Sequence, residues 1–280
     1  MNELQYTPTR FNILPPVVKN LLIINGLFYL ARITLQNTWG IDLDNILGLH
    51  YIHSEYFAPY QFITHLFMHS NFGHLFFNMF ALWMFGNVLE NILGPKKFLI
   101  YYFVTGLGAA FLHSIVVSYQ AYQLQTAVNF FLDYPTPDSF YKLLEYYFPH
   151  VLNDIKINEF ILRWREYPYD ISAINEASEL IKNGTNTILN IPTVGASGAV
   201  FGLLLAFGMF FPNSYIYLYF LFPIKAKWFV IFYGLAELLL GFSNRPGDNV
   251  AHFAHLGGMI FGFLLIKYWL GKQNKNNYYT

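Results

Sequence analysis

The stretch TVGASGAVFGLLLAFGMFF, Thr193–Phe211, opens with small residues around a serine and continues as an apolar run. Its length and composition predict a membrane-spanning helix, because the apolar core of a bilayer takes about 20 residues of helix. Ser197 lies where that helix begins, between Ala196 and Gly198. In that position it is filler, a helix cap, a packing spacer or a nucleophile, and only the rest of the chain distinguishes these roles.

The composition of the whole chain is that of a membrane protein. Of the 280 residues, 55% are hydrophobic and 20% are aromatic, but only 11% are charged, whereas soluble domains carry about 25% charged residues. Basic and acidic side chains are equal in number, 16 of each, so the net charge of zero predicts no nucleic-acid partner. The absence of cysteine excludes disulfides, zinc–thiolate sites and a thiol nucleophile.

Six apolar stretches have the length of membrane-spanning helices. They are Val17–Gln36, Thr64–Leu89, Phe98–Tyr119, Thr193–Phe211, Trp228–Phe242 and Asn249–Leu270. The fifth is short and can extend back through FLFPIKAK (220–227), since Pro223 suits a helix start. The expected fold class is therefore an all-α integral membrane protein with six transmembrane helices in residues 17–271. Residues 1–16 and 272–280 are expected to be a short cytoplasmic N-terminal segment and a cytoplasmic tail.

One long polar region, at about 120–190, separates the third span from the fourth. Apolar residues recur at helical spacing in FYKLLEYYF (140–148) and INEFILRWREY (157–167), which predicts short amphipathic helices. The region is therefore expected to be an extracytoplasmic insert of helices and loops.

Lysine and arginine in the short loops predict the orientation of the chain. With a cytoplasmic N-terminus, that side receives Arg10, Lys19, Lys96, Lys97, Lys225, Lys227, Lys267, Lys272 and Lys275. The short segments of the opposite side hold only Arg32 and Arg245. This imbalance predicts that both chain ends lie in the cytoplasm.

Three polar clusters fall on the outer side in this orientation, each at the start of a span. They are THLFMHSNFGHLFFN (64–78), VGASG (194–198) and DNVAHFAH (248–255). Polar groups at membrane depth are energetically costly and are therefore candidates for function. Their coincidence on one leaflet favours a shared site.

The sixth span aligns two histidines with two glycines. His252, His255, Gly258 and Gly262 share one helical face, and Gly198 and Gly202 give the serine helix a G-x-x-x-G packing face of its own. If the two glycine faces meet, an imidazole lies against Ser197, and a neutral histidine is the usual base for a buried serine. One of the two histidines can instead be satisfied by a hydrogen bond to its own helix, so the base stays open at this point.

The first cluster offers hydrogen-bond donors for a negatively charged intermediate. His74 and Asn78 are one helical turn apart, and both can donate to an oxyanion together with the backbone N–H of Ser197. His65 and His69 have the spacing of a zinc-binding helix but lack the glutamate of H-E-x-x-H. We therefore expect these two histidines to be structural, and we predict no metal and no other cofactor.

The sequence offers no obvious acid to complete a catalytic triad. Asp248 suits a helix cap. Glu237, within the fifth span, and Glu90, at the end of the second, are expected to be structural polar partners, with a proton relay as the alternative.

Three motifs, G-A-S-G at 195–198, A-H-x-x-G-x-x-x-G at 254–262 and H-x-x-x-x-H-x-x-x-N at 69–78, resemble those of the rhomboid family of intramembrane serine proteases. The order of the motifs, the six spans and the predicted topology also resemble its bacterial members. The resemblance implies hydrolysis of membrane proteins that contain a transmembrane segment, near the outer face of the bilayer. It also implies a multi-pass protein of the bacterial cytoplasmic membrane, with the active site facing outward.

The resemblance assigns a role to each matching residue. It makes Ser197 the nucleophile and His255 the base, as a Ser–His dyad without a third acid. It implies an oxyanion hole of His74, Asn78 and the Ser197 backbone N–H, supported by Gly195, Gly198, Phe201, Gly258 and Gly262, with Phe201 stacked on the histidine. His252 does not fit the family spacing.

The chain departs from the family pattern in two places, and two other function classes remain open. Tyr60 and Gln61 stand where some members have Trp-Arg, and the insert at about 120–190 is unusually large. One alternative is a catalytically inactive relative that binds transmembrane helices of client proteins. The other is a small transporter with a proton path along His65, His69, His74 and His252, which would not depend on Ser197.

Overall fold

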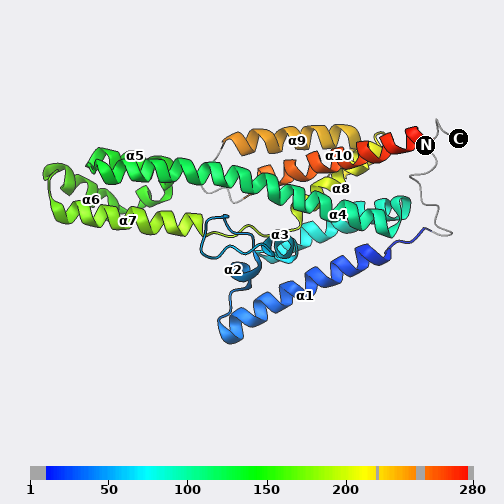
Figure 1. The fold of residues 1–280 in the computed structure, drawn as a ribbon, viewed down its shortest axis with the longest axis horizontal. Coiled ribbons are helices and arrows are strands. Elements are labelled where there is room, and N and C mark those ends of the chain that lie inside the picture. Colours follow the sequence, from blue (N-terminus) through cyan, green and yellow to red (C-terminus); the bar gives the residue numbers. More distant parts are fainter. Residues whose placement is uncertain (1–10, 219–220, 244–249, 277–280) are drawn as a thin grey trace.

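The computed structural model describes residues 11–218, 221–243 and 250–276. Its elements in chain order are α1 (Pro16–Trp39), α2 (Leu43–Leu47), α3 (Gln61–Thr64), η1 (His65–Phe67), α4 (Phe72–Asp133), α5 (Pro137–Tyr147), η2 (Pro149–Asn153), α6 (Ile155–Glu166), α7 (Ile171–Leu189), α8 (Ser197–Phe210), β1 (Tyr215–Leu218), β2 (Phe222–Lys225), α9 (Ala226–Ser243) and α10 (His252–Asn276). The predicted all-α membrane fold is confirmed, with one short hairpin as its β-structure in these ranges (Figure 1).

Several predicted features fall outside these ranges. They are residues 1–10 of the N-terminal segment, Arg10, Arg245, Asp248, the first residue of the sixth span, Asn249, and residues 277–280 of the tail.

The apolar stretches all form helices, but not one helix each. α1, α4, α9 and α10 are long and apolar enough to cross a membrane, and α8 is apolar but shorter. α4 contains both the second and the third predicted spans, which are divided at Gly94, where the backbone leaves helical geometry with φ of 75°. Glycine tolerates this left-handed conformation, and Pro95 then starts the next helical segment. The number of membrane crossings and the positions of the chain ends remain predictions.

The helix boundaries differ from the predicted spans where local polar contacts intervene. The second span begins at Phe72 and not at Thr64, because Asn71 caps α4 by accepting from the N–H of His74. The fifth does not extend back through FLFPIKAK. Residues Phe222–Lys225 pair instead with β1 as an antiparallel hairpin, and α9 begins at Ala226.

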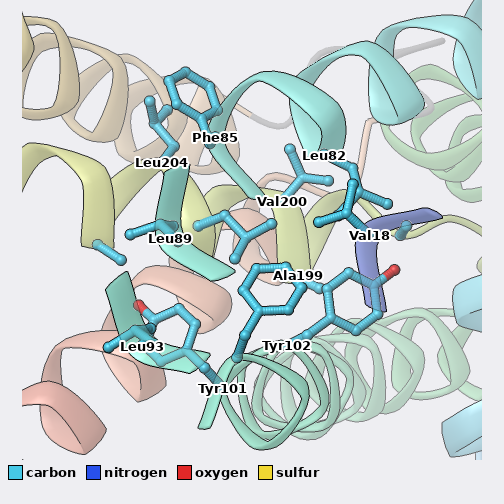
Figure 2. Close-up of a cluster of buried hydrophobic side chains, with 14 of the residues drawn as sticks. Val18, Leu82, Phe85, Leu89, Leu93, Tyr101, Tyr102, Ala199, Val200 and Leu204 are labelled. Carbon is cyan, nitrogen blue, oxygen red and sulfur yellow. The ribbon is translucent and has the colours of Figure 1, made fainter. Parts of the chain in front are cut away.

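The central helix is α8, which is buried on nearly every side. It contacts both α4 and α10, and its buried residues include Ala199, Val200 and Leu204. Figure 2 shows these side chains among Leu82 and Phe85 of α4 and other members of the same core cluster. An apolar helix is stable against lipid as well as against other helices, and the small residues Gly198, Gly202 and Gly208 are what allow neighbouring helices to approach α8 closely.

The insert is a helical unit with its own core. The part of α4 from Pro95 to Asp133 is about 58 Å long at 1.5 Å per residue, nearly twice the roughly 30 Å apolar thickness of a bilayer. Its far end packs with α5, α6 and α7 around buried Phe140, Trp164 and Ile181, and these helices lie at one end of the molecule (Figure 1). The amphipathic helices predicted at 140–148 and 157–167 are thus confirmed as α5 and α6.

Candidate active site

The segment that leads into Ser197 is extended and tied to the loop between α1 and α4. Thr193 pairs with Leu49 through two backbone hydrogen bonds of 2.8 Å, and the N–H of Gly195 donates to the carbonyl of His65 at 2.9 Å. Gly195 has a φ of 128°, a conformation that favours glycine. The fourth predicted span, which is α8, therefore begins at Ser197 and not at Thr193, so the serine occupies the first turn of α8.

One of the predicted glycine contacts, Gly258 on Gly198, brings the serine helix against α10, whereas Gly202 and Gly262 both lie against side chains of α4. A Cβ atom at Gly258 would overlap the carbonyl oxygen of Gly198, and one at Gly262 would overlap the hydroxyl of Tyr101. One at Gly202 would lie 2.6 Å from Thr105. Only glycine permits this approach, and the approach places the imidazole of His255, one turn before Gly258, beside α8.

The serine, a histidine and a glutamate form a continuous chain of hydrogen bonds. Ser197 Oγ lies 2.9 Å from His255 Nε2, and His255 Nδ1 lies 2.9 Å from Glu237 Oε2. His252 Nδ1 lies 2.6 Å from the same glutamate oxygen. The exposed fractions are 4% for Glu237 and 8% for each histidine, so these polar contacts are shielded from bulk water.

The ring of Phe201 fixes the plane of the His255 imidazole. The two rings are stacked with centroids 4.0 Å apart and an angle of 5° between their planes. Tyr233 of α9 packs on Phe201 in turn, at 4.9 Å. The stacking that the family resemblance implied for Phe201 is thus present in the structure.

Of the donors expected for an oxyanion, His74 lies next to the segment that leads into the serine. The imidazole of His74 faces Gly195, since a Cβ there would lie 2.7 Å from His74 Nε2. Asn78 is buried one turn further along α4 and donates to the carbonyl of His74 at 2.9 Å. The N–H groups in the first turn of α8, including that of Ser197, have no acceptor within the helix. A joint action of these groups on one oxyanion remains a prediction.

The remaining predicted polar residues organise the neighbouring loop. His65 Nδ1 contacts the carbonyl of Gln61 at 2.8 Å, whereas neither ring nitrogen of the buried His69 makes a hydrogen bond. Gln61 is fully buried: its side-chain amide donates to two loop carbonyls and its oxygen accepts from the N–H groups of His50 and Ala58. Gln61 thus holds this loop together through its side-chain hydrogen bonds.

Glu237 is the polar residue whose partner the sequence did not identify. We expected a structural polar partner, with a proton relay as the alternative, and the structure shows its carboxylate in contact with the candidate base. The available signal was a single acid within the apolar helix AKWFVIFYGLAELLLGFS. Such acids in spanning helices usually face the interior and mark function.

Among the described residues, Glu237, His252 and His255 form a group that could also hold a metal ion. Tetrahedral zinc with ligands at 2.0–2.2 Å separates its ligand atoms by about 3.3 Å. The nitrogen–oxygen distances of 2.6 and 2.9 Å are shorter than this and are those of hydrogen bonds. The geometry therefore fits proton-sharing contacts better than metal ligation.

Comparison with known proteins gives matches on both sides of the insert. A family model described as a rhomboid domain matches residues 56–128 and 172–272, which include every residue of the hydrogen-bonded chain. A curated protein, "Rhomboid-like protein 11, chloroplastic" from Arabidopsis thaliana, is 33% identical over 87 residues, or 30% of this chain and 31% of that protein. The match thus spans about a third of the length of that relative.

Proposed function

The chain belongs to the rhomboid family, and on that premise we propose that it is an intramembrane serine endopeptidase. The observation that carries the proposal is the distance of 2.9 Å between Ser197 Oγ and His255 Nε2, at the start of a central, buried helix. An unassisted serine hydroxyl is a weak nucleophile, and a histidine within hydrogen-bond reach is the base that activates it.

The proposed reaction passes through an acyl-enzyme. Ser197 Oγ attacks the carbonyl carbon of the substrate peptide while its proton moves to His255 Nε2. His255 gives that proton to the leaving nitrogen as the carbon–nitrogen bond breaks, which leaves the acyl group on the serine. Water then attacks the ester carbon while His255 takes its proton, and the bond from that carbon to Ser197 Oγ breaks as His255 returns the proton to Oγ, which releases the new carboxyl terminus and restores the serine.

The developing negative charge is stabilised, in this proposal, by the Ser197 backbone N–H with the side chains of His74 and Asn78. The position of the His74 ring against Gly195 supports its part. The part of Asn78 rests on its burial one turn away. Removal of one such donor typically lowers the rate by a factor of about 10²–10³.

The substrates we propose are membrane proteins with a transmembrane segment, cleaved where the helix is interrupted. A regular helix hides its carbonyl groups in hydrogen bonds, so small, helix-breaking residues expose the peptide bond. We place the protein in the bacterial cytoplasmic membrane because its motifs resemble those of bacterial rhomboids, and we place Ser197 toward the outer side because of the basic residues in its short loops.

Labelling by a fluorophosphonate in liposomes tests the proposal. Wild type is expected to label covalently, and Ser197→Ala and His255→Ala are expected to lose the label. Ser118→Ala is the matched control, because that hydroxyl only donates to the carbonyl of Ser114 in its own helix. Folded wild type that neither labels nor cleaves a transmembrane substrate would overturn the protease proposal in favour of a helix-binding relative.

A further inference from the structure

A buried acid on a third helix contacts the candidate base, and the family resemblance does not account for it. Glu237 is one of only three buried residues in α9, the others being Ala226 and Val230, within the described part of the chain. An isolated carboxylate in an apolar environment loses much of its hydration energy, so it persists only where other groups compensate. Two imidazole nitrogens supply that compensation, at 2.6 and 2.9 Å.

The direction of these hydrogen bonds follows from the chemistry of the groups. An ionised carboxylate accepts and does not donate, so the proton of each bond belongs to the imidazole. For His255 this places the hydrogen on Nδ1 and leaves the lone pair of Nε2 toward Ser197 Oγ. That tautomer is the one that can remove the serine proton.

We propose that Glu237 is the positioning residue of the active site, which holds His255 in its base tautomer and stabilises the imidazolium formed during attack. The inference rests on the proposed protease function. The proton balance is unchanged by it: the serine proton moves to His255 Nε2 and then to the leaving nitrogen, while Glu237 stays ionised throughout. His252 anchors the same carboxylate oxygen from the preceding turn of α10.

The geometry divides the catalytic parts among three helices. Ser197 comes from α8, His255 from α10 and Glu237 from α9. The stacked pair of Phe201 and His255 fixes the ring plane, but stacking alone leaves the ring free to exchange tautomers. Only the carboxylate distinguishes Nδ1 from Nε2, and this is the task we assign to it.

The test compares Glu237→Gln and Glu237→Asp with Glu90→Gln in liposomes. Glu90 is a matched control, because it is equally buried but only accepts from the N–H groups of Val17 and Val18 at the start of α1. For Glu237→Gln we expect kcat and the rate of fluorophosphonate labelling to fall together, on the order of 100-fold, with KM unchanged. Glu237→Asp restores the charge with a shorter reach, so its kcat is expected to lie between those of wild type and Glu237→Gln.

A spectroscopic readout keeps the test valid if a variant folds poorly. Proton NMR of wild type with ¹⁵N-labelled histidine is expected to show a strongly deshielded Nδ1–H resonance that is assigned to His255 by its loss in His255→Ala, and that Glu90→Gln keeps and Glu237→Gln loses. Absence of that resonance from wild type would overturn the inference and leave the protease proposal intact. Labelling of Glu237→Gln at a rate within about threefold of wild type would have the same meaning. Wild type without any labelling would instead refute the proposed function itself.

Discussion

The contact between Gly198 and Gly258 predicts a large effect from one added methyl group. In Gly258→Ala the new Cβ would overlap the carbonyl oxygen of Gly198, which is backbone and cannot rotate away. Real Cβ atoms do not approach other atoms closer than 3.0 Å, so α8 and α10 must separate by on the order of 1 Å, with an overpacking penalty of about 1–3 kcal/mol.

That separation acts directly on the serine–histidine distance. His255 lies one turn before Gly258, so the gap of 2.9 Å between Ser197 Oγ and His255 Nε2 opens with the helices. A misplacement of about 1 Å in a catalytic pair can lower the rate by roughly 100-fold. We therefore expect the kcat of Gly258→Ala to fall by about that factor, beyond any loss of thermal stability.

A second glycine of the same helix supplies the control. A Cβ atom added at Gly271 of α10 would meet nothing within 4 Å, so Gly271→Ala should keep full activity and gain up to about 1 kcal/mol from better helix propensity. The assay is cleavage of a single-span substrate in proteoliposomes, with thermal unfolding in detergent in parallel. If Gly258→Ala keeps the kcat of Gly271→Ala, the contact between the helices does not set the catalytic geometry.

Three further predictions concern orientation, the insert and metal ions. The chain has no cysteine, so a single introduced cysteine can be labelled selectively. Tyr169→Cys, at an exposed position before α7, should react with a membrane-impermeant maleimide from outside intact spheroplasts, whereas Lys96→Cys should not. The opposite pattern would refute the predicted orientation. Trp164→Ala removes a side chain that is 1% exposed and should destabilise the insert by about 3–5 kcal/mol, so that protease cuts within 134–190 while Ser197 still labels. Loss of labelling on this change would show that the two cores are not independent. Dialysis against a chelator should leave kcat unchanged, and a loss restored by added zinc would assign Glu237, His252 and His255 to a metal site.

Periodic small residues explain why the sequence could place one of two histidines against Ser197, while the choice of His255 came from the resemblance to the rhomboid family. Gly198, Gly258 and His255 have spacings that a helix converts directly into one face, and close helix approach requires glycine wherever two such faces meet. The contact therefore depends on local pattern more than on the rest of the fold. The stacking of Phe201 on the histidine was likewise implied by the resemblance and not by the spacing of small residues.

Glu237 and the long α4 could not be predicted in this way, because both depend on packing between distant segments. A single acid in an apolar helix indicates that it has a partner but not which helix supplies it. Residues 120–133 are polar enough to suggest a loop, and they stay helical because Leu124, Val128 and Phe131 join the buried core of the insert. The capping of α4 by Asn71, which moved the predicted start of the second span, was a local signal that apolar length obscured.

The unbroken helical course of α4 from Pro95 to Asp133 also bears on how much room a client protein would have. His113 of this helix contacts Thr193 beside the serine, at 2.9 Å, and the helix then runs about 30 Å further to Asp133 before α5–α7 begin. Because α4 itself joins the core of the insert, it holds the insert at a fixed distance from Ser197. In the orientation that we propose, a client with an unfolded stretch next to its transmembrane segment would pass the insert, whereas a folded domain that starts at the bilayer surface would meet the insert before its peptide bond reaches the serine.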